Sequence, residues 1–135
     1  MLQILLAEDN PADVLLVRRA LKQHNIEHQL HVVKDGAEAL EFMDNMGKPG
    51  NAPCPDLMLL DLNMPKVDGP QVLKEFRKND ACVHTPVIVV TSSDTPKERL
   101  KMSELGVACY FRKPLELAAF MQLGAVVGQV LNGSL

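Results

Sequence analysis

The chain has 135 residues, 47% of them apolar, which matches the size and composition of one globular domain. Its net charge of −3 at pH 7 argues against a nucleic-acid partner, because such a partner would require a basic face. No apolar run approaches the length of a membrane span and the amino terminus lacks the pattern of a signal peptide, so we expect no membrane association and a cytoplasmic location.

Apolar runs and helix-like stretches alternate along the chain. In the first half the pattern predicts a strand, a helix, a strand, a helix and a Pro- and Gly-rich loop, over Gln3–Ala7, Ala12–Gln23, Leu30–Val33, Gly36–Asn45 and residues 47–55. In the second half it predicts three further strand and helix pairs, over Leu57–Leu60, Pro70–Lys78, Val87–Val90, Lys97–Leu105, Val107–Phe111 and Leu115–Leu131.

Continuous apolar strands that alternate with helices indicate a parallel sheet covered on both faces. We therefore predict an α/β fold, a doubly wound (βα)5 flavodoxin-like three-layer sandwich with strand order 2-1-3-4-5. The whole chain, residues 1–135, is expected to form this single domain.

Polar residues follow four of these strands at their carboxyl ends, namely Glu8 and Asp9, Asp61, Thr91 and Lys113. In a parallel sheet these ends meet at one edge, where the first and third strands flank the switch point. Three crowded carboxylates repel each other unless a cation lies between them. Mg²⁺ suits such a place, because it takes a few carboxylates and keeps several waters.

The same residues suggest phosphoryl chemistry. Asp61 is a candidate nucleophile, since a carboxylate can form an aspartyl phosphate. Lys113 and the metal would neutralise charge on the transferring phosphoryl group, and the hydroxyl of Thr91 would donate a hydrogen bond to a phosphate oxygen.

Each residue also has a purely local interpretation. Glu8 and Asp9 could cap the following helix, Asp61 could be a turn residue, Thr91 could be a helix N-cap, and Lys113 could be a solvated lysine. A site is favoured because all of them fall at the same end of successive strands. The three cysteines are odd in number, widely spaced and without a C-x-x-C pair, so we expect reduced thiols.

The sequence resembles the response regulator receiver family of two-component signalling over essentially its whole length. The matching residues are Glu8-Asp9, Asp61-Leu62-Asn63-Met64-Pro65, Asp68-Gly69, Thr91-Ser92, Tyr110 and Lys113-Pro114. The resemblance implies a receiver domain with no output domain, whose phosphoacceptor is Asp61. By this resemblance it would be a switch that catalyses its own phosphorylation and dephosphorylation, and not a turnover enzyme.

Further roles follow from the same resemblance. Asp9 and Asp61 would be the side-chain ligands of Mg²⁺, with Glu8 acting largely through water and Asn63 offering its backbone carbonyl. Lys113 would bind the phosphate, and Thr91 and Tyr110 would be the switch pair that alters the surface formed by the fourth helix, the fifth strand and the last helix.

The partner implied is a sensor histidine kinase. The stretches Glu8-Asp9-Asn10-Pro11-Ala12-Asp13 and Leu62-Asn63-Met64-Pro65-Lys66, with the Pro-rich loop, look like the small response regulators paired with bacterial phytochromes. The last helix is apolar around more than one face, so it is either buried on several sides or part of a homodimer surface with the neighbouring elements.

Two other classes of protein fit less well. A haloacid-dehalogenase-type phosphatase needs an acid two residues after its nucleophile, where this chain has Asn63. A flavodoxin-like electron carrier needs a phosphate-cradling loop after the first strand, where this chain has two acids. A calcium loop starting at Asp61 fails because Pro65 and Lys66 occupy positions that need a ligand and a glycine.

Overall fold

The computed structural model describes residues 1–45, 54–66, 68–79, 82–93 and 95–133. Within these ranges five parallel strands form one sheet in the order β2-β1-β3-β4-β5. The strands are β1 Leu2–Ala7, β2 His28–Val33, β3 Leu57–Leu60, β4 Val87–Thr91 and β5 Cys109–Arg112. The helices are α1 Pro11–Gln23, α2 Gly36–Asn45, α3 Gly69–Lys78, α4 Pro96–Glu104, α5 Leu117–Phe120 and α6 Leu123–Leu131.

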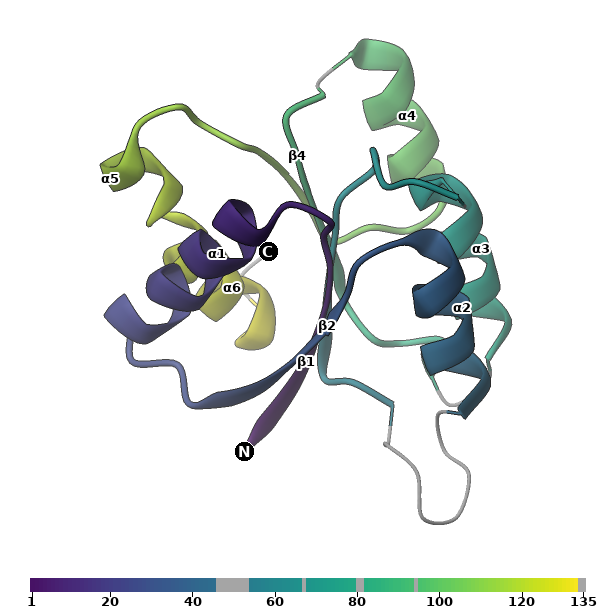
Figure 1. Ribbon diagram of the computed structural model, residues 1–135, viewed down its shortest axis with the longest axis horizontal. Helices are drawn as coiled ribbons and strands as arrows, with labels where there is room; N and C mark the ends of the chain where they lie inside the picture. Colours follow the sequence, from purple (N-terminus) through teal and green to yellow (C-terminus); the bar gives the residue numbers. More distant parts are fainter. Residues whose placement is uncertain (46–53, 67, 80–81, 94, 134–135) are drawn as a thin grey trace.

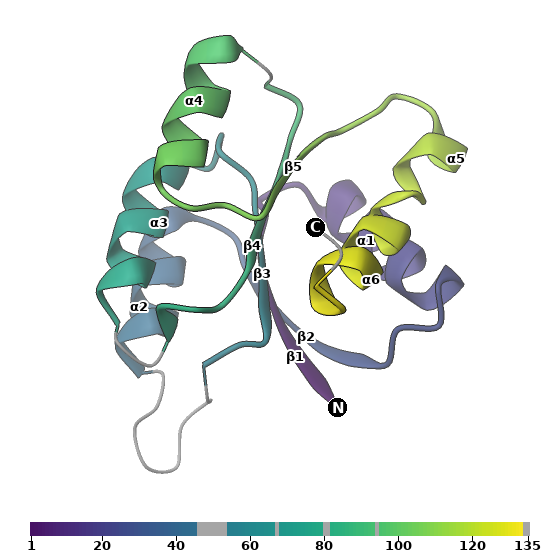
Figure 2. The same ribbon diagram turned by 180° about the vertical axis from the view of Figure 1, so that it is seen from behind.

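The predicted fold class and strand order are confirmed. Helices α1, α5 and α6 cover one face of the sheet and α2, α3 and α4 cover the other (Figure 1, and from behind in Figure 2). Both faces are covered, so β3 and β4 are buried along their whole length. Each face has its own hydrophobic core, one containing Phe76 and the other Phe120. Of the loop predicted over residues 47–55, only Cys54 and Pro55 lie within the described residues.

The residues that cap helices α1 and α4 are not the ones that the sequence had suggested as possible caps. Helix α1 is capped by Asn10, whose side chain accepts a hydrogen bond from the amide of Ala12 at 2.9 Å. Helix α4 is capped by Thr95, whereas Thr91 is the last residue of β4. The capping hypotheses for Glu8, Asp9 and Thr91 are therefore wrong, because other residues cap those helices.

The last helix is broken into α5 and α6, whereas the sequence pattern predicted one helix over Leu115–Leu131. Around the break the amides of Gln122 and Gly124 bond to carbonyls three residues back, at 3.2 and 3.1 Å, as in a tighter 3₁₀ turn. The ring of His24, from the end of α1, hydrogen-bonds the carbonyl of Met121 at 3.1 Å. A side chain from another helix thus contacts the backbone where α5 ends.

Helix α6 is buried on two sides, which explains its apolar composition. Leu123, Val127 and Val130 are buried against the sheet, and Val126 and Leu131 pack against the same core. Helix α1 lies against α6 on a second side. None of the helices within the described ranges is long and apolar enough to cross a membrane.

The α1–α6 contact depends on Gly124. A Cβ atom added there would collide with the carbonyl of Ala20 and with the ring of His24. We expect Gly124→Ala to lower the free energy of unfolding by about 1 to 3 kcal/mol, the usual cost of overpacking. Gly128→Ala is the matched control on the same helix, because a Cβ there meets nothing within 4 Å. It should stabilise the helix by roughly 0.5 to 1 kcal/mol. Urea unfolding of both variants measures this, and equal stabilities would refute the close contact.

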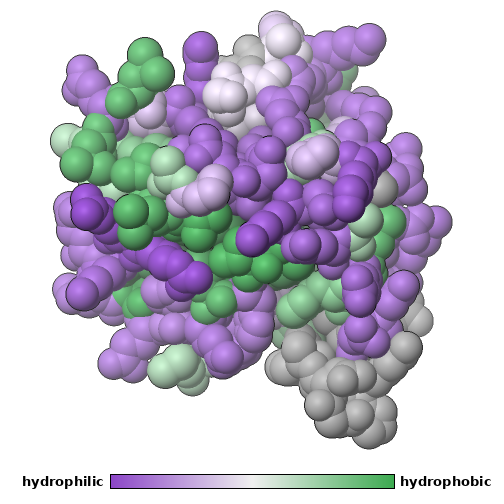
Figure 3. Space-filling view, viewed as in Figure 1, coloured by the Kyte–Doolittle hydropathy of each residue, from purple (hydrophilic) through white to green (hydrophobic). Residues whose placement is uncertain are grey.

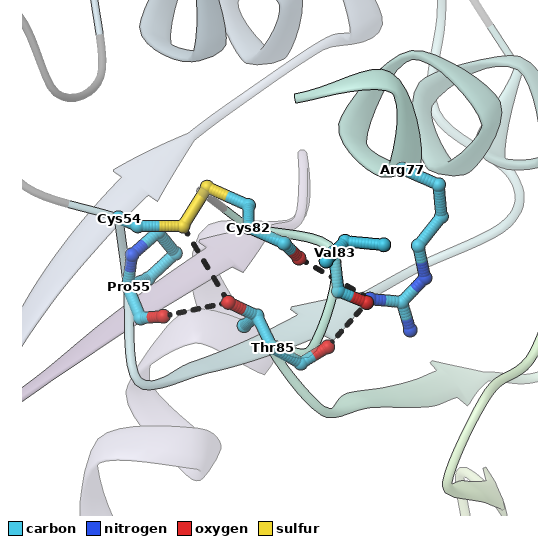
Figure 4. Close-up of a disulfide and its surroundings, with 6 residues drawn as sticks. All are labelled: Cys54, Pro55, Arg77, Cys82, Val83 and Thr85. Carbon is cyan, nitrogen blue, oxygen red and sulfur yellow. Dashed lines mark hydrogen bonds between the residues drawn. A yellow bond between two sulfur atoms is a disulfide. The ribbon is translucent and has the colours of Figure 1, made fainter. Parts of the chain in front are cut away.

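A disulfide joins Cys54, just before β3, to Cys82, in the turn after α3 (Figure 4). Their Cα atoms are 5.7 Å apart, within the usual range for a disulfide. The expectation of three reduced thiols is therefore wrong for this pair, and Cys109 is the free cysteine. Two cysteines 28 residues apart give no pairing signal in sequence, because the sheet alone brings β3 and β4 together.

The turn that carries Cys82 is also clamped by hydrogen bonds. Arg77, near the end of α3, donates to the carbonyls of Val83 at 3.2 Å and Thr85 at 2.7 Å. The hydroxyl of Thr85 donates to the carbonyl of Pro55 at 3.1 Å (Figure 4). These contacts connect the segments that precede β3 and β4. They lie at the amino-terminal ends of the strands, opposite the carboxyl ends that carry Asp61 and Thr91.

Candidate functional site

Strand register brings the acidic residues together. Ala7 of β1 pairs with Leu60 of β3, so the residues that follow these two leave the sheet side by side. The amide of Asp61 also donates to the carbonyl of Ala7 at 3.0 Å. One carboxylate oxygen from each of Glu8, Asp9 and Asp61 lies within 4.8 Å of the others.

The three carboxylates differ in their exposure. The side chain of Glu8 is 2% exposed and that of Asp61 is 8% exposed, whereas Asp9 lies at the surface. The cluster is therefore closed on the protein side and open to solvent at Asp9. Hard oxygen ligands with one open side fit a divalent cation such as Mg²⁺, which keeps several waters.

Lys113 lies among these acids, in the segment between β5 and α5. Its Nζ atom is 2.5 Å from Glu8 Oε1, 2.8 Å from Asp13 Oδ2 and 3.2 Å from Asp61 Oδ2. The predicted proximity of Lys113 to the carboxylates is thus observed. Asp13, in the first turn of α1, is not among the site residues that the sequence pattern predicted, because an acid at that place in a helix is explained by the helix dipole alone.

Burial raises the pKa of the Glu8 carboxyl. Loss of solvation, together with repulsion from Asp61, raises the pKa of the Glu8 carboxyl to about 7, although hydrogen bonding to Lys113 acts in the opposite direction. For Lys113, burial alone would lower the pKa. The hydrogen bonds to Asp13 and Glu8 outweigh burial and raise the pKa of Lys113 above its ordinary value.

Glu8 should make the metal-free protein less stable as the pH rises. Because its pKa is about 7 in the folded protein against 4.5 ordinarily, the folded state binds more protons between these values, and stability falls across that window. We expect Glu8→Gln to raise the free energy of unfolding by about 1 to 3 kcal/mol at pH 8 and to change it little at pH 4. Urea unfolding in EDTA measures this, with exposed Glu104→Gln as the control. A less stable Gln variant at pH 8 would contradict the burial argument.

Thr91 and Asn63 lie next to the acidic cluster. The hydroxyl oxygen of Thr91, which is fully buried, accepts hydrogen bonds from the amide of Ser93 at 3.2 Å and from Asn63 Nδ2 at 3.4 Å. The backbone amide of Asn63 donates to Asp61 Oδ1 at 3.1 Å. Since Thr91 Oγ1 is an acceptor in both bonds, its own proton remains a donor.

Tyr110 connects β5 to the loop after β4. Its hydroxyl donates to the carbonyl of Ser93 at 2.6 Å, and the guanidinium of Arg99 on α4 lies 4.4 Å from the ring centroid. The ring is half-buried and packs against the core on the α2–α4 side. Ser93 therefore contacts both members of the predicted switch pair, Thr91 through its amide and Tyr110 through its carbonyl.

The fold and site together define a small α/β module whose sheet edge suits a divalent cation and a phosphoryl group. Residues 4–123 match the response regulator receiver domain family. The response regulator Rcp1 of Synechocystis sp. is 42% identical over 114 residues, which are 84% of this chain and 78% of Rcp1. The chain belongs to the response regulator receiver domain family.

Solved structures agree with this assignment. The phosphorylated cyanobacterial phytochrome response regulator RcpA has a TM-score of 0.87 and 34% identity, with 99% of this chain and 96% of that chain covered. The Mn²⁺-bound form of Rcp1 has a TM-score of 0.84 and 37% identity, with 96% and 93% covered. The bacteriophytochrome response regulator AtBRR has a TM-score of 0.72 and 36% identity, with 95% and 93% covered.

Proposed function

We propose that this receiver accepts a phosphoryl group on Asp61 from a sensor histidine kinase and signals through a change of surface. The observation that carries the proposal is the convergence of Glu8, Asp9, Asp61 and Lys113 at one edge of the sheet. A buried carboxylate between a metal-binding cluster and an ammonium group is suited to form an aspartyl phosphate.

The acidic cluster would hold Mg²⁺. Asp9 and Asp61 would bind it through carboxylate oxygens, Glu8 through water and Asn63 through its backbone carbonyl. The Mn²⁺-bound form of Rcp1 supports a divalent ion in a related chain. Bound there, the ion supplies positive charge that offsets the negative charge of the transferring phosphoryl group.

The transfer itself needs little from the protein beyond position and charge. An oxygen of Asp61 attacks phosphorus, and the bond from phosphorus to the donor, a histidine nitrogen in a kinase, breaks with its electron pair leaving on that nitrogen. Lys113 donates a hydrogen bond to one phosphoryl oxygen and the Thr91 hydroxyl donates to another. The residues hold and stabilise the reaction at one Asp, so the protein acts as a switch and not as a turnover enzyme.

The signal would travel through the loop after β4. The phosphoryl group on Asp61 carries about two negative charges and draws the Thr91 hydroxyl towards it. Thr91 and Tyr110 both hydrogen-bond to Ser93, so a shift of Thr91 disturbs the bond that holds the Tyr110 hydroxyl. Movement of Tyr110 then changes the surface of α4, β5 and α5, because Arg99 of α4 lies over its ring.

Partner and assembly follow from the family and the surface. RcpA is a cyanobacterial phytochrome response regulator and AtBRR a bacteriophytochrome response regulator, which supports a phytochrome-type histidine kinase as the phosphoryl donor. We also propose a cytoplasmic location. Apolar side chains gather over the α1 and α5 side of the molecule (Figure 3). Leu115 is fully exposed and Leu117 half exposed, which supports homodimer formation near α5. Sedimentation of wild type and Leu115→Ser measures whether the protein forms a dimer and whether Leu115 contributes to it. A wild-type protein that sediments as a monomer, like the variant, would exclude the homodimer.

Phosphorylation of the wild-type chain tests the proposal. Acetyl phosphate with Mg²⁺ should add one phosphoryl group per chain by intact mass, and EDTA should prevent it. With beryllofluoride, a phosphoryl mimic, NMR shifts should extend from Thr91 to Tyr110 and α4. The absence of labelling would refute the phosphoacceptor. Shifts confined to residues around Asp61 would refute the switch while leaving the phosphoacceptor intact.

A further inference from the structure

Asp13 contacts Lys113 although it lies outside the three-carboxylate cluster. Its Oδ2 atom is 2.8 Å from Lys113 Nζ, closer than the 3.2 Å between Nζ and Asp61. The side chains of Asp13 and Lys113 are only 20% and 11% exposed, so the pair is largely shielded from water. We propose that Asp13 is a positioning residue that holds the Lys113 ammonium on the α1 side of the site. This inference rests on the proposed function of Asp61.

The number of donors on the ammonium supports this role. A lysine ammonium has three N–H donors, and among the described residues Glu8, Asp13 and Asp61 are the three acceptors of Lys113. Glu8 and Asp61 belong to the metal-binding cluster, so a bound cation draws on the same carboxylates. Asp13 is the acceptor that can keep its hydrogen bond to Lys113 while the cation and the phosphoryl group bind. One N–H donor of Lys113 is then free to turn from Asp61 to the phosphoryl group.

A structural role for Asp13 is the alternative explanation. An acid in the first turn of a helix stabilises the helix dipole, and Asp13 is in that turn of α1. Another acid in the same turn would do this equally well, whereas the contact with Lys113 requires position 13. Ala12 is exposed and precedes Asp13, so it offers a place for a relocated charge.

Three variants separate the two roles. Asp13→Asn removes the charge that holds Lys113, Ala12→Asp/Asp13→Asn keeps the net charge and the dipole interaction, and Asp13→Glu keeps a carboxylate at position 13. We expect Asp13→Asn to weaken Mg²⁺ binding about three- to tenfold, because the released ammonium competes for Glu8 and Asp61. At saturating Mg²⁺ it should slow labelling by acetyl phosphate about fivefold or more, because Lys113 is no longer aligned.

The double variant should show the same losses while recovering the thermal stability of wild type, and Asp13→Glu should recover part of both functional values. NMR titration gives the Mg²⁺ dissociation constant independently of labelling. The inference would be overturned if Asp13→Asn had the Mg²⁺ dissociation constant and labelling rate of wild type. It would also be overturned if the double variant recovered both of these values. If wild type itself is not labelled, the proposed function fails, and the Mg²⁺ titration still decides whether Asp13 holds Lys113.

Discussion

Replacing Asp61 by Asn is expected to abolish phosphorylation of the protein, with a loss of at least about 100-fold in labelling by acetyl phosphate. The amide of Asn cannot act as the carboxylate nucleophile that forms an acyl phosphate. The substitution is nearly isosteric and leaves an oxygen for the amide of Asn63, which now donates to Asp61 at 3.1 Å. The fold should therefore persist, and the loss should be chemical. Intact mass and Phos-tag electrophoresis measure it in the presence of Mg²⁺.

Asp44→Asn is the matched control, because Asp44 is an exposed aspartate near the end of α2. It should be labelled at the wild-type rate. Undiminished labelling of Asp61→Asn would transfer the acceptor role to another carboxylate of the cluster, Glu8 or Asp9, both of which approach Asp61 within the same 4.8 Å group. Mapping the modified peptide would then identify it.

Reduction of the Cys54–Cys82 disulfide is expected to lower the free energy of unfolding by about 3 to 4 kcal/mol. The pair closes a loop of 28 residues, and cross-linking a loop of that length restricts the unfolded chain by roughly this amount in the chain-entropy description. For a domain of this size the melting temperature should fall by roughly 10 °C. Comparing oxidised protein with dithiothreitol-reduced protein leaves the sequence unchanged.

Thiol titration in denaturant should find one free thiol in oxidised protein, that of Cys109, and three after reduction. Cys109→Ser is the control, since it should leave the effect of dithiothreitol intact. Cys54 precedes Asp61 by seven residues of largely extended chain, roughly 20 Å, so labelling of Asp61 should not change on reduction. Equal stability of the oxidised and reduced forms would contradict a bridging role.

Much of the fold was predictable because it depends on the order of local signals along the chain. A strand with an unbroken apolar run, such as Leu57–Leu60, is stable only where both faces of the sheet are covered. The helices that connect successive strands indicate that these strands run parallel. Parallel strands place all their carboxyl ends at one edge, so the sequence alone predicts that Glu8, Asp9, Asp61 and Lys113 lie together. Their grouping is a consequence of topology and not of any single side chain.

Helix boundaries were less predictable, because capping is decided by which side chain reaches a free amide. Asn10 and Thr95 cap α1 and α4, although Glu8, Asp9 and Thr91 are also residues of the polar kind found near helix starts. The break between α5 and α6 involves His24 from a different helix, whose ring bonds the carbonyl of Met121. The apolar pattern from Leu115 to Leu131 does not predict that contact.

The α/β class, the strand order and the residues that meet at the edge of the sheet follow from the sequence, since they depend on alternating patterns and the geometry of parallel strands. The pairing of Cys54 with Cys82 and the contact of Asp13 with Lys113 depend instead on how the folded elements pack against one another. These partners are 28 and 100 residues apart. Their contacts depend on distances of a few ångströms between separately formed elements, which packing sets and local sequence does not encode.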